Sequence, residues 1–104
     1  MKTYFGKRNP EGIGGAPVYC KQPNAETYPI RERQDLRNHS PDGLNWGYGG
    51  SGAAQCALAI LADCLGDSQM ALRHYQNFKW DFVSKWKHSF EIAEDEILEW
   101  LDKQ

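Results

Sequence analysis

The stretch from Asp35 to Gly66, DLRNHSPDGLNWGYGGSGAAQCALAILADCLG, determines the fold that we expect for this chain. It places the polar cluster Arg37–Ser40 before the glycine-rich turn Gly47–Gly52. It then continues into a segment rich in alanine, leucine and cysteine. In that segment only Gln55 and Asp63 are polar. A helix of this composition is buried around most of its circumference, so we expect it to be central.

The ends of this central helix carry residues that begin and terminate helices. Ser51 is expected to be the N-cap, and Gly66 stands where a glycine commonly ends a helix. Asp67 or Ser68 then caps a second predicted helix. Its apolar residues recur at three- and four-residue spacing as far as Trp86.

Short segments before the central helix predict a small sheet. Thr3–Lys7 and Pro17–Lys21 contain β-favouring residues on either side of the turn signal Asn9–Gly12, which indicates a hairpin. Tyr28–Arg33 is a further predicted strand. Pro29 confines it to a sheet edge, because proline has no N–H to donate.

Two more short segments favour strands, and a last helix is expected. Leu44–Trp46, after the turn-forming residues Asn38–Gly43, is a strand candidate, and Phe90–Ile92 alternates as a half-buried strand does. Glu94–Lys103 is typical of a helix, because acids in its first turn complement the helix dipole. The residues of this helix expected to face inward are Ile97, Leu98 and Leu101.

Together these elements predict an α+β fold. We expect a small, mainly antiparallel sheet packed on the central alanine-rich helix, with two further helices. The 104 residues suit a single domain, with a strand- and loop-rich part over residues 1–50 and a helix-rich part over residues 51–104. Hydrophobic residues make up 40% of the chain, which argues against extensive disorder.

The charges are distributed unevenly along the chain. The net charge is only −2, so the chain as a whole is not attracted to nucleic acid or membranes, and direct nucleic-acid binding is not expected. Residues 1–50 hold seven basic and five acidic residues, whereas residues 51–104 hold five and nine. Six of the acidic residues occur between Glu91 and Asp102.

The cysteines and the lack of long apolar segments indicate a cytoplasmic protein. None of the three cysteines forms a CxxC pair, and Cys56 and Cys64 lie too far apart on the predicted helix to form a disulfide. Reduced thiols are the simple interpretation. No segment is long enough to span a bilayer, and the N-terminal residues contain no apolar signal sequence.

The glycine turn satisfies the pattern G-x-G-x-x-G at a helix start. Backbone N–H groups at such a position can bind an anion. A dinucleotide-binding fold is not indicated, because no βαβ unit follows, and a Walker loop is excluded because Gly-Lys-Ser/Thr is missing. The alternative is a tight turn whose glycines permit close packing of the buried helix. The candidate ligand-binding residues of the turn are Tyr48, Gly49, Gly50, Ser51 and Gly52.

The polar cluster Arg37–Ser40 supplies the second group of candidates. Arg37 can pair with a carboxylate or a phosphate, and Asn38, His39 and Ser40 can add directional hydrogen bonds. Alternatively, Asp35 and Arg37 pair with each other while the remaining residues build turns.

Neither catalysis nor metal binding is indicated. Ser51 resembles the serine of a nucleophile elbow, but such hydrolases need a larger α/β sheet, and N-capping explains this serine without chemistry. The three histidines and three cysteines lack the spacing of metal ligands, and no cofactor is expected. Tyr48 and Trp80 are expected to be exposed, where they could stack on a base or on a partner.

Five motifs carry a resemblance to known sequences. They are Asp35–Pro41 (DLRNHSP), Trp46–Gln55 (WGYGGSGAAQ), Leu61–Asp63 (LAD), Tyr4–Arg8 (YFGKR) and Tyr75–Lys79 (YQNFK). With these motifs the chain resembles a family of small uncharacterised bacterial, phage and plasmid proteins. The family is a domain of unknown function, so the resemblance implies a bacterial or mobile-element setting and no catalytic residues. For a phage protein of this size, interference with a host defence system becomes a reasonable hypothesis.

These observations lead to three hypotheses about function. The leading one is a non-enzymatic binding protein in which Arg37–Ser40 and the glycine turn hold an anionic, nucleotide-like ligand. The rival is a protein-interaction inhibitor that occupies a host defence complex through the acidic C-terminal region or exposed aromatic residues. The third is a small structural domain without a ligand. An enzyme is not expected, because nucleophile, base and orienting residue cannot be assembled from these residues.

Overall fold

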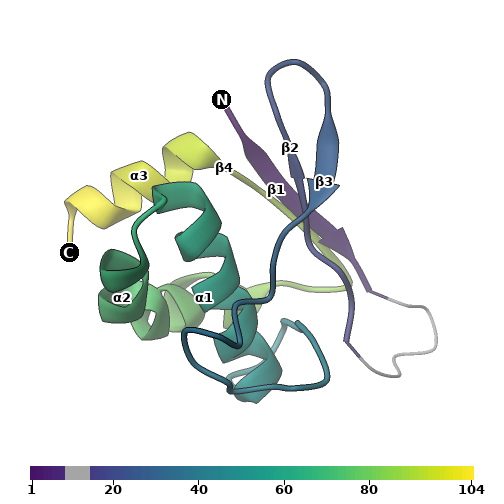
Figure 1. Cartoon of the computed structure of the whole chain (residues 1–104), viewed down its shortest axis with the longest axis vertical. Coiled ribbons are helices and arrows are strands. Elements are labelled where there is room, and N and C mark those ends of the chain that lie inside the picture. Colours follow the sequence, from purple (N-terminus) through teal and green to yellow (C-terminus); the bar gives the residue numbers. More distant parts are fainter. Residues whose placement is uncertain (9–14) are drawn as a thin grey trace.

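The computed structural model describes residues 1–8 and 15–104, and it confirms the predicted α+β class (Figure 1). The predicted turn Asn9–Gly12 lies outside the described residues. The elements in chain order are β1 (Thr3–Lys7), β2 (Tyr19–Lys21), β3 (Thr27–Pro29), α1 (Ser51–Leu65), α2 (Ser68–Asp81), the short 3₁₀ helix η1 (Val83–Lys85), β4 (Ser89–Ala93) and α3 (Glu94–Asp102).

The strands form an antiparallel sheet in the order β3-β2-β1-β4. β1 and β2 pair as predicted, with Tyr4 opposite Cys20. β4 returns from the helical half of the chain and pairs with β1, where Tyr4 lies opposite Ile92. β3 is an edge strand, and Pro29 lies in it opposite Tyr19, which agrees with the position predicted for that proline.

The helices cover one face of the sheet, and α1 is the most deeply buried of them (Figure 1). Every residue from Gly52 to Ala62 is buried, which confirms the predicted central helix. Gly66 ends α1 in the left-handed conformation, with φ of 62°, and its N–H donates to the Ala62 carbonyl at 3.0 Å. Asp67 then caps α2 by accepting from two backbone N–H groups, at 3.0 and 3.1 Å.

A hydrogen-bonded carboxylate ties α1 to the sheet. Asp63, on α1, accepts from the phenol of Tyr4 at 2.6 Å and from that of Tyr28 at 2.9 Å. Lys2 Nζ adds an ion pair at 3.7 Å. Burial, reinforced by the hydrogen bond to Asp63, raises the pKa of the Tyr4 phenol. One carboxylate therefore links the central helix to β1 and to β3.

The cysteines are free thiols, as the sequence predicted. Cys56 is buried within α1, and Cys64 is half-buried at its end. Burial raises the pKa of both thiols, that of Cys64 to about 12. Among the described residues, no helix is both long enough and apolar enough to cross a membrane.

The predicted strand Leu44–Trp46 is wrong. The Leu44 carbonyl accepts from the Ala16 N–H at 2.8 Å, and the Asn45 N–H donates to the Gly52 carbonyl at 3.1 Å. The segment thus bonds to two different parts of the chain instead of to one neighbouring strand. Its side chains Leu44 and Trp46 are nevertheless buried, which explains why the segment resembled a strand.

The strand predicted over Tyr28–Arg33 is misplaced. β3 occupies Thr27–Pro29. Ile30 still donates its N–H to the Val18 carbonyl at 2.9 Å, but Arg33 has a positive φ of 62°. That left-handed conformation is incompatible with an extended run.

Two helix boundaries also differ from the prediction. The N-cap of α1 is Gly50 and not Ser51, because the Gly50 carbonyl already accepts the N–H of Ala54 at 3.0 Å. α2 ends at Asp81 instead of continuing to Trp86, because the residue after Asp81 leaves helical geometry with φ of −127°. The short helix η1 follows.

The inward face of α3 is narrower than predicted. Ile97 is fully buried, and Trp100 and Leu101 are half-buried at the three- and four-residue spacing that shares its face. Leu98 is 42% exposed, because it lies about 100° around the helix from Ile97. The prediction that Leu98 faces inward is therefore wrong.

Candidate functional site

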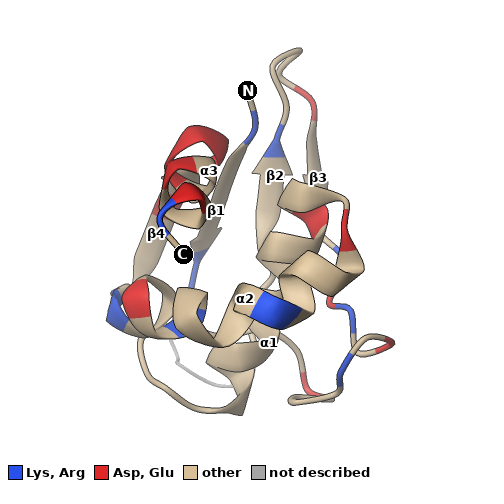
Figure 2. Cartoon of the chain, turned by 90° about the vertical axis from the view of Figure 1, so that its left-hand side faces the viewer, with Lys and Arg blue, Asp and Glu red and all other residues tan. Residues whose placement is uncertain are grey.

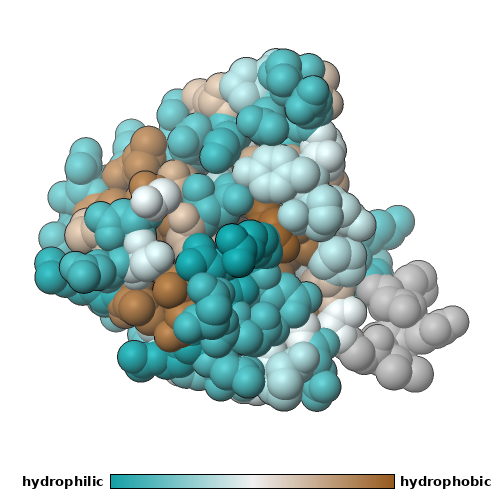
Figure 3. All heavy atoms as spheres, viewed as in Figure 1, coloured by the Kyte–Doolittle hydropathy of each residue, from teal (hydrophilic) through white to brown (hydrophobic). Residues whose placement is uncertain are grey.

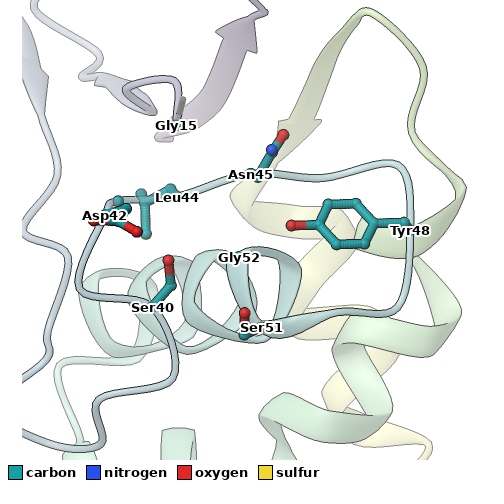
Figure 4. Close-up of a pocket in the computed structure, with 9 residues that line it drawn as sticks. Gly15, Ser40, Asp42, Leu44, Asn45, Tyr48, Ser51 and Gly52 are labelled. Atoms are coloured by element: carbon teal, nitrogen blue, oxygen red, sulfur yellow. The ribbon is translucent and has the colours of Figure 1, made fainter. Parts of the chain in front are cut away.

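A pocket of about 280 Å³ lies between the loop that follows β3 and the start of α1 (Figure 4). Ser40 and Asp42 come from the loop, and Ser51 comes from the first turn of α1. In Figure 4 the hydroxyl groups of Ser40, Ser51 and Tyr48 are directed into the space around Gly52. The complete lining consists of Gly15, Ser40, Asp42, Gly43, Leu44, Asn45, Tyr48, Ser51 and Gly52.

The loop side of the pocket is held by Gln55, whose side chain on α1 is completely buried. Its Oε1 accepts from the backbone N–H of His39 at 2.8 Å and from that of Ser40 at 3.2 Å. Its Nε2 donates to the Glu32 carbonyl at 2.6 Å. Gln34 also donates to the Ser40 carbonyl, at 3.0 Å. Buried hydrogen bonds therefore position Ser40 relative to α1.

The glycines before α1 are explained by close packing. The Tyr48 ring lies against Gly50 and the Trp80 ring lies against Gly49, so closely that a Cβ atom at either glycine would overlap with the ring. At Gly52 a Cβ atom would lie 2.7 Å from the Tyr48 hydroxyl. These contacts favour the packing interpretation of the turn, but they also place Tyr48 at the pocket.

The start of α1 presents backbone N–H groups beside this pocket. The first hydrogen bond of the helix runs from the Ala54 N–H to the Gly50 carbonyl. The N–H groups of Ser51, Gly52 and Ala53 precede that bond, and the first turn contains no acidic residue. This end of α1 therefore carries the positive end of the helix dipole without a neighbouring carboxylate from its own first turn.

The His39 side chain forms a hydrogen bond with a residue of α2 and does not line the pocket. Its Nε2 lies 2.6 Å from the Tyr75 hydroxyl. Burial, together with the nearby charges of Arg37 and Lys79, lowers the pKa of His39. Lys79 is only 7% exposed, and its ammonium group lies 4.3 Å from the centre of the Trp80 ring. The Trp80 ring also packs on Gly49 of the glycine turn, so the positive charge of Lys79 lies near the start of α1.

The structure brings together only part of the predicted site. Ser40, Tyr48, Ser51 and Gly52 line the pocket, whereas the other predicted residues lie outside its lining. These other residues are Arg37, Asn38, His39, Gly49 and Gly50. The ion pair between Asp35 and Arg37, which was the alternative for this cluster, does not form, because Asp35 pairs with Arg33 at 3.0 Å. Arg37 and Asn38 are exposed.

Sequence reasoning missed Asp42, Asn45 and Lys79 as functional candidates. Asp42 lies in a segment whose composition predicts a turn, and Asn45 lies in the predicted strand Leu44–Trp46. Their contribution depends on the way the loop folds back over α1, which no local pattern indicates. Lys79 could have been found, because it follows Tyr75 by one helical turn and therefore shares its face of α2.

Comparison with known sequences places the chain in a family. A family model described as a family of unknown function (DUF6166) matches residues 4–103. The chain belongs to this family. The match agrees with the resemblance to a domain of unknown function. Comparisons with curated proteins and with solved structures gave no match.

In this DUF6166 chain the pocket is suited to hydrogen bonding. The hydroxyls of Ser40, Ser51 and Tyr48 can donate and accept, whereas an ionised Asp42 only accepts. Within residues 1–8 and 15–104, no group of three or more histidine, cysteine or acidic side chains could hold a metal ion. The pocket therefore combines hydroxyl groups and one carboxylate with two residues, Ser51 and Gly52, from the first turn of α1.

Proposed function

We propose that this protein is a non-enzymatic binding protein that holds a nucleotide-like ligand in the pocket at the start of α1. The observation that carries the proposal is the convergence of three hydroxyl groups and a helix start on one cavity of about 280 Å³. A cavity of this size is at the lower end of the range of small-molecule sites.

The polar groups of the pocket favour a ligand with two different ends. The N–H groups at the start of α1 favour an anionic group such as a phosphate. The Asp42 carboxylate repels a second anion but accepts hydrogen bonds from hydroxyl groups, as acidic residues do from a ribose in nucleotide-binding folds. The Tyr48 side chain is 44% exposed, so its ring is available for stacking on a base.

Two basic residues outside the lining, the predicted Arg37 and the unpredicted Lys79, have a supporting role in this proposal. Arg37 is exposed, and Lys79 lies close enough to affect the pKa of His39. Their positive charges attract an anionic ligand toward this side of the molecule without lining the pocket.

Thermal unfolding with a panel of compounds tests the proposal. Ligands that bind the folded state raise the midpoint, so a nucleotide should raise it more than either the matching nucleoside or inorganic phosphate. Asp42→Asn and Ser51→Ala should reduce this increase, whereas Ser89→Ala, at an exposed position of β4, should leave it unchanged. The proposal fails if no compound shifts the midpoint, or if the pocket variants respond as the native protein does.

A second proposal is binding to a partner protein, such as a component of a host defence complex, through α3. Figure 2 shows acidic residues concentrated on this helix. Leu98 supports the proposal, because it is 42% exposed in the middle of the acidic helix. Beside the carboxylates, its side chain offers apolar surface that a partner protein can bury on contact. Retention of a partner by the native chain, and its loss with Leu98→Ser, would support this role.

A further inference from the structure

A groove of about 260 Å³ lies between α3 and the residue that follows α2. It is on the helical side of the molecule, where Figure 3 shows hydrophobic residues interrupting a largely hydrophilic surface. The groove is distinct from the pocket at the start of α1, with which it shares no residue. Its lining consists of Phe82, Glu96, Glu99, Trp100 and Lys103.

Two aromatic rings form the apolar part of this groove. The rings of Phe82 and Trp100 meet nearly at a right angle, with an interplanar angle of 78° and centroids 6.2 Å apart. Trp100 is held in place, because its Nε1 donates to Asp81 at 2.8 Å and its ring forms a T-shaped pair with that of Phe78, with centroids 5.3 Å apart. Both lining aromatics are only half-buried, so part of each remains available.

Carboxylates border the same groove. Glu96 and Glu99 are three residues apart on α3, so they project from the same side of the helix, and both are exposed. Lys103 is the basic residue at the groove, and it lies at the exposed end of the chain. Aromatic rings beside carboxylates attract a cation, since the ring faces and the carboxylates are both negative.

We propose that this groove binds an arginine side chain of a partner protein. A planar guanidinium group can stack on Trp100 while it donates paired hydrogen bonds to a carboxylate at the rim, and it is more weakly hydrated than an ammonium group. The inference rests on the second proposed function, the binding of a partner through α3, and it names the chemistry of that contact.

Chemical-shift mapping on the ¹⁵N-labelled full chain tests this inference. The probes are the capped peptide Gly-Gly-Arg-Gly-Gly, the same peptide with neutral citrulline in place of arginine, and a tetra-arginine peptide. The arginine peptide should shift the Trp100 indole signal and not that of the buried Trp46, whereas the citrulline peptide should shift neither. If citrulline acts as arginine does, the inference is overturned.

Matched charge variants separate the groove from general attraction to an acidic helix. Glu96→Gln/Glu99→Gln should weaken binding of the arginine peptide by about fivefold, because it removes both carboxylates of the groove and exposed ion pairs are individually weak. Glutamine retains the ability of residue 96 to bond the Ala93 N–H, so the start of α3 is preserved. Glu91→Gln/Asp102→Asn removes the same charge outside the groove and should weaken binding less than about twofold. Lys103→Gln should strengthen binding.

The outcomes distinguish the inference from the proposed function on which it rests. If tetra-arginine shifts α3 amide signals while the Trp100 indole stays unmoved, the groove is excluded and partner binding through α3 stands. If the two double variants weaken binding of the arginine peptide equally, the groove is likewise excluded and partner binding through α3 stands. If neither basic peptide shifts any α3 signal, both the groove and an arginine-bearing partner for α3 are excluded.

Discussion

The side-chain oxygen of Gln55 accepts the backbone N–H of His39 at 2.8 Å, which joins the core of α1 to the loop that forms one side of the pocket. The same buried side chain also bonds Ser40 and Glu32, at 3.2 and 2.6 Å. A residue that seemed exceptional in an apolar helix is therefore the residue that fixes the loop.

Gln55→Ala should lower the free energy of unfolding by roughly 2–4 kcal/mol, because it leaves buried backbone groups without partners and creates a cavity. Urea denaturation measures this loss. Amide exchange should accelerate at His39 and Ser40 more than in β1. Gln76→Ala, at an exposed position of α2, is the matched control and should change stability by less than about 0.5 kcal/mol. Native-like exchange at His39 in Gln55→Ala would contradict the role assigned to Gln55.

The Tyr4–Asp63 pair predicts loss of stability at high pH. The pKa of the buried Tyr4 phenol is raised in the folded protein, so folding favours its protonated form. The contribution is complete below the unfolded pKa of about 10 and is lost progressively above it. Cys56 and Cys64, whose pKa values are also raised, should begin to destabilise the fold from about pH 9.

The variant Tyr4→Phe separates the contribution of Tyr4 to this pH dependence from that of the two cysteines. It should lower stability at neutral pH, since the bond to Asp63 is lost, but the fall in stability above pH 10 should become shallower. Tyr19→Phe, on the outer face of the sheet, should leave the slope unchanged. Urea denaturation between pH 8 and 11 in the presence of a reductant measures both slopes. Identical slopes for native protein and Tyr4→Phe would be evidence against the pKa shift.

Most of the fold could be predicted because its signals are local. The low polarity of residues 53–65 indicated a buried helix, and Gly66 and Asp67 marked the boundary between α1 and α2 through backbone conformation and capping. Pro29 indicated an edge strand because it cannot donate. Each of these signals depends on a residue and its immediate neighbours, and the structure agrees with all of them.

The predicted strand over Leu44–Trp46 fails because contacts between distant segments override the local pattern, whereas the start of α1 is displaced by a single residue. Leu44–Trp46 alternates as a strand does, yet its hydrogen bonds go to Ala16 and Gly52. Ser51 is a favourable N-cap residue, but the backbone of Gly50 takes that position.

The candidate site was harder to predict for the same reason. Composition directed attention to the stretch of chain that contains most of the pocket lining, but Asp42 and Asn45 reach the pocket only because the loop folds back over α1. Arg37 is a candidate because its guanidinium can pair with a phosphate, but it does not line the pocket. The backbone N–H of Ser40 donates to Gln55 and holds Ser40 at the pocket, whereas the Arg37 side chain is exposed.

His39 predicts a loss of stability on mild acidification. Its pKa is lowered in the folded protein by burial and by the charges of Arg37 and Lys79, so folding favours the neutral ring. The contribution is present above the unfolded pKa of about 6.5 and is lost as the pH falls below it. Stability should therefore decrease from pH 7.5 to pH 5.5, and less steeply in His39→Asn. His88→Asn, at an exposed position, should retain the native slope.

The close packing around Gly52 predicts that a side chain at this position would affect both stability and the residues that line the pocket. A Cβ atom at this position would lie 2.7 Å from the Tyr48 hydroxyl and 2.8 Å from the Asn45 Cβ. Alanine improves helix propensity by up to about 1 kcal/mol, whereas overpacking costs about 1–3 kcal/mol. Gly52→Ala should therefore lower the free energy of unfolding by about 1 kcal/mol, because the steric cost exceeds the gain in propensity.

A double-mutant cycle with Tyr48→Ala identifies the source of this cost. Removing the Tyr48 ring relieves one of the two overlaps, so Gly52→Ala should be less harmful in the Tyr48→Ala background by at least about 0.5 kcal/mol. Urea denaturation of the four proteins gives the coupling energy, and amide shifts at Asn45 show whether the remaining overlap moves the loop. Additive effects would mean that Tyr48 swings away freely from the pocket. That result would also weaken the assignment of its hydroxyl to ligand binding.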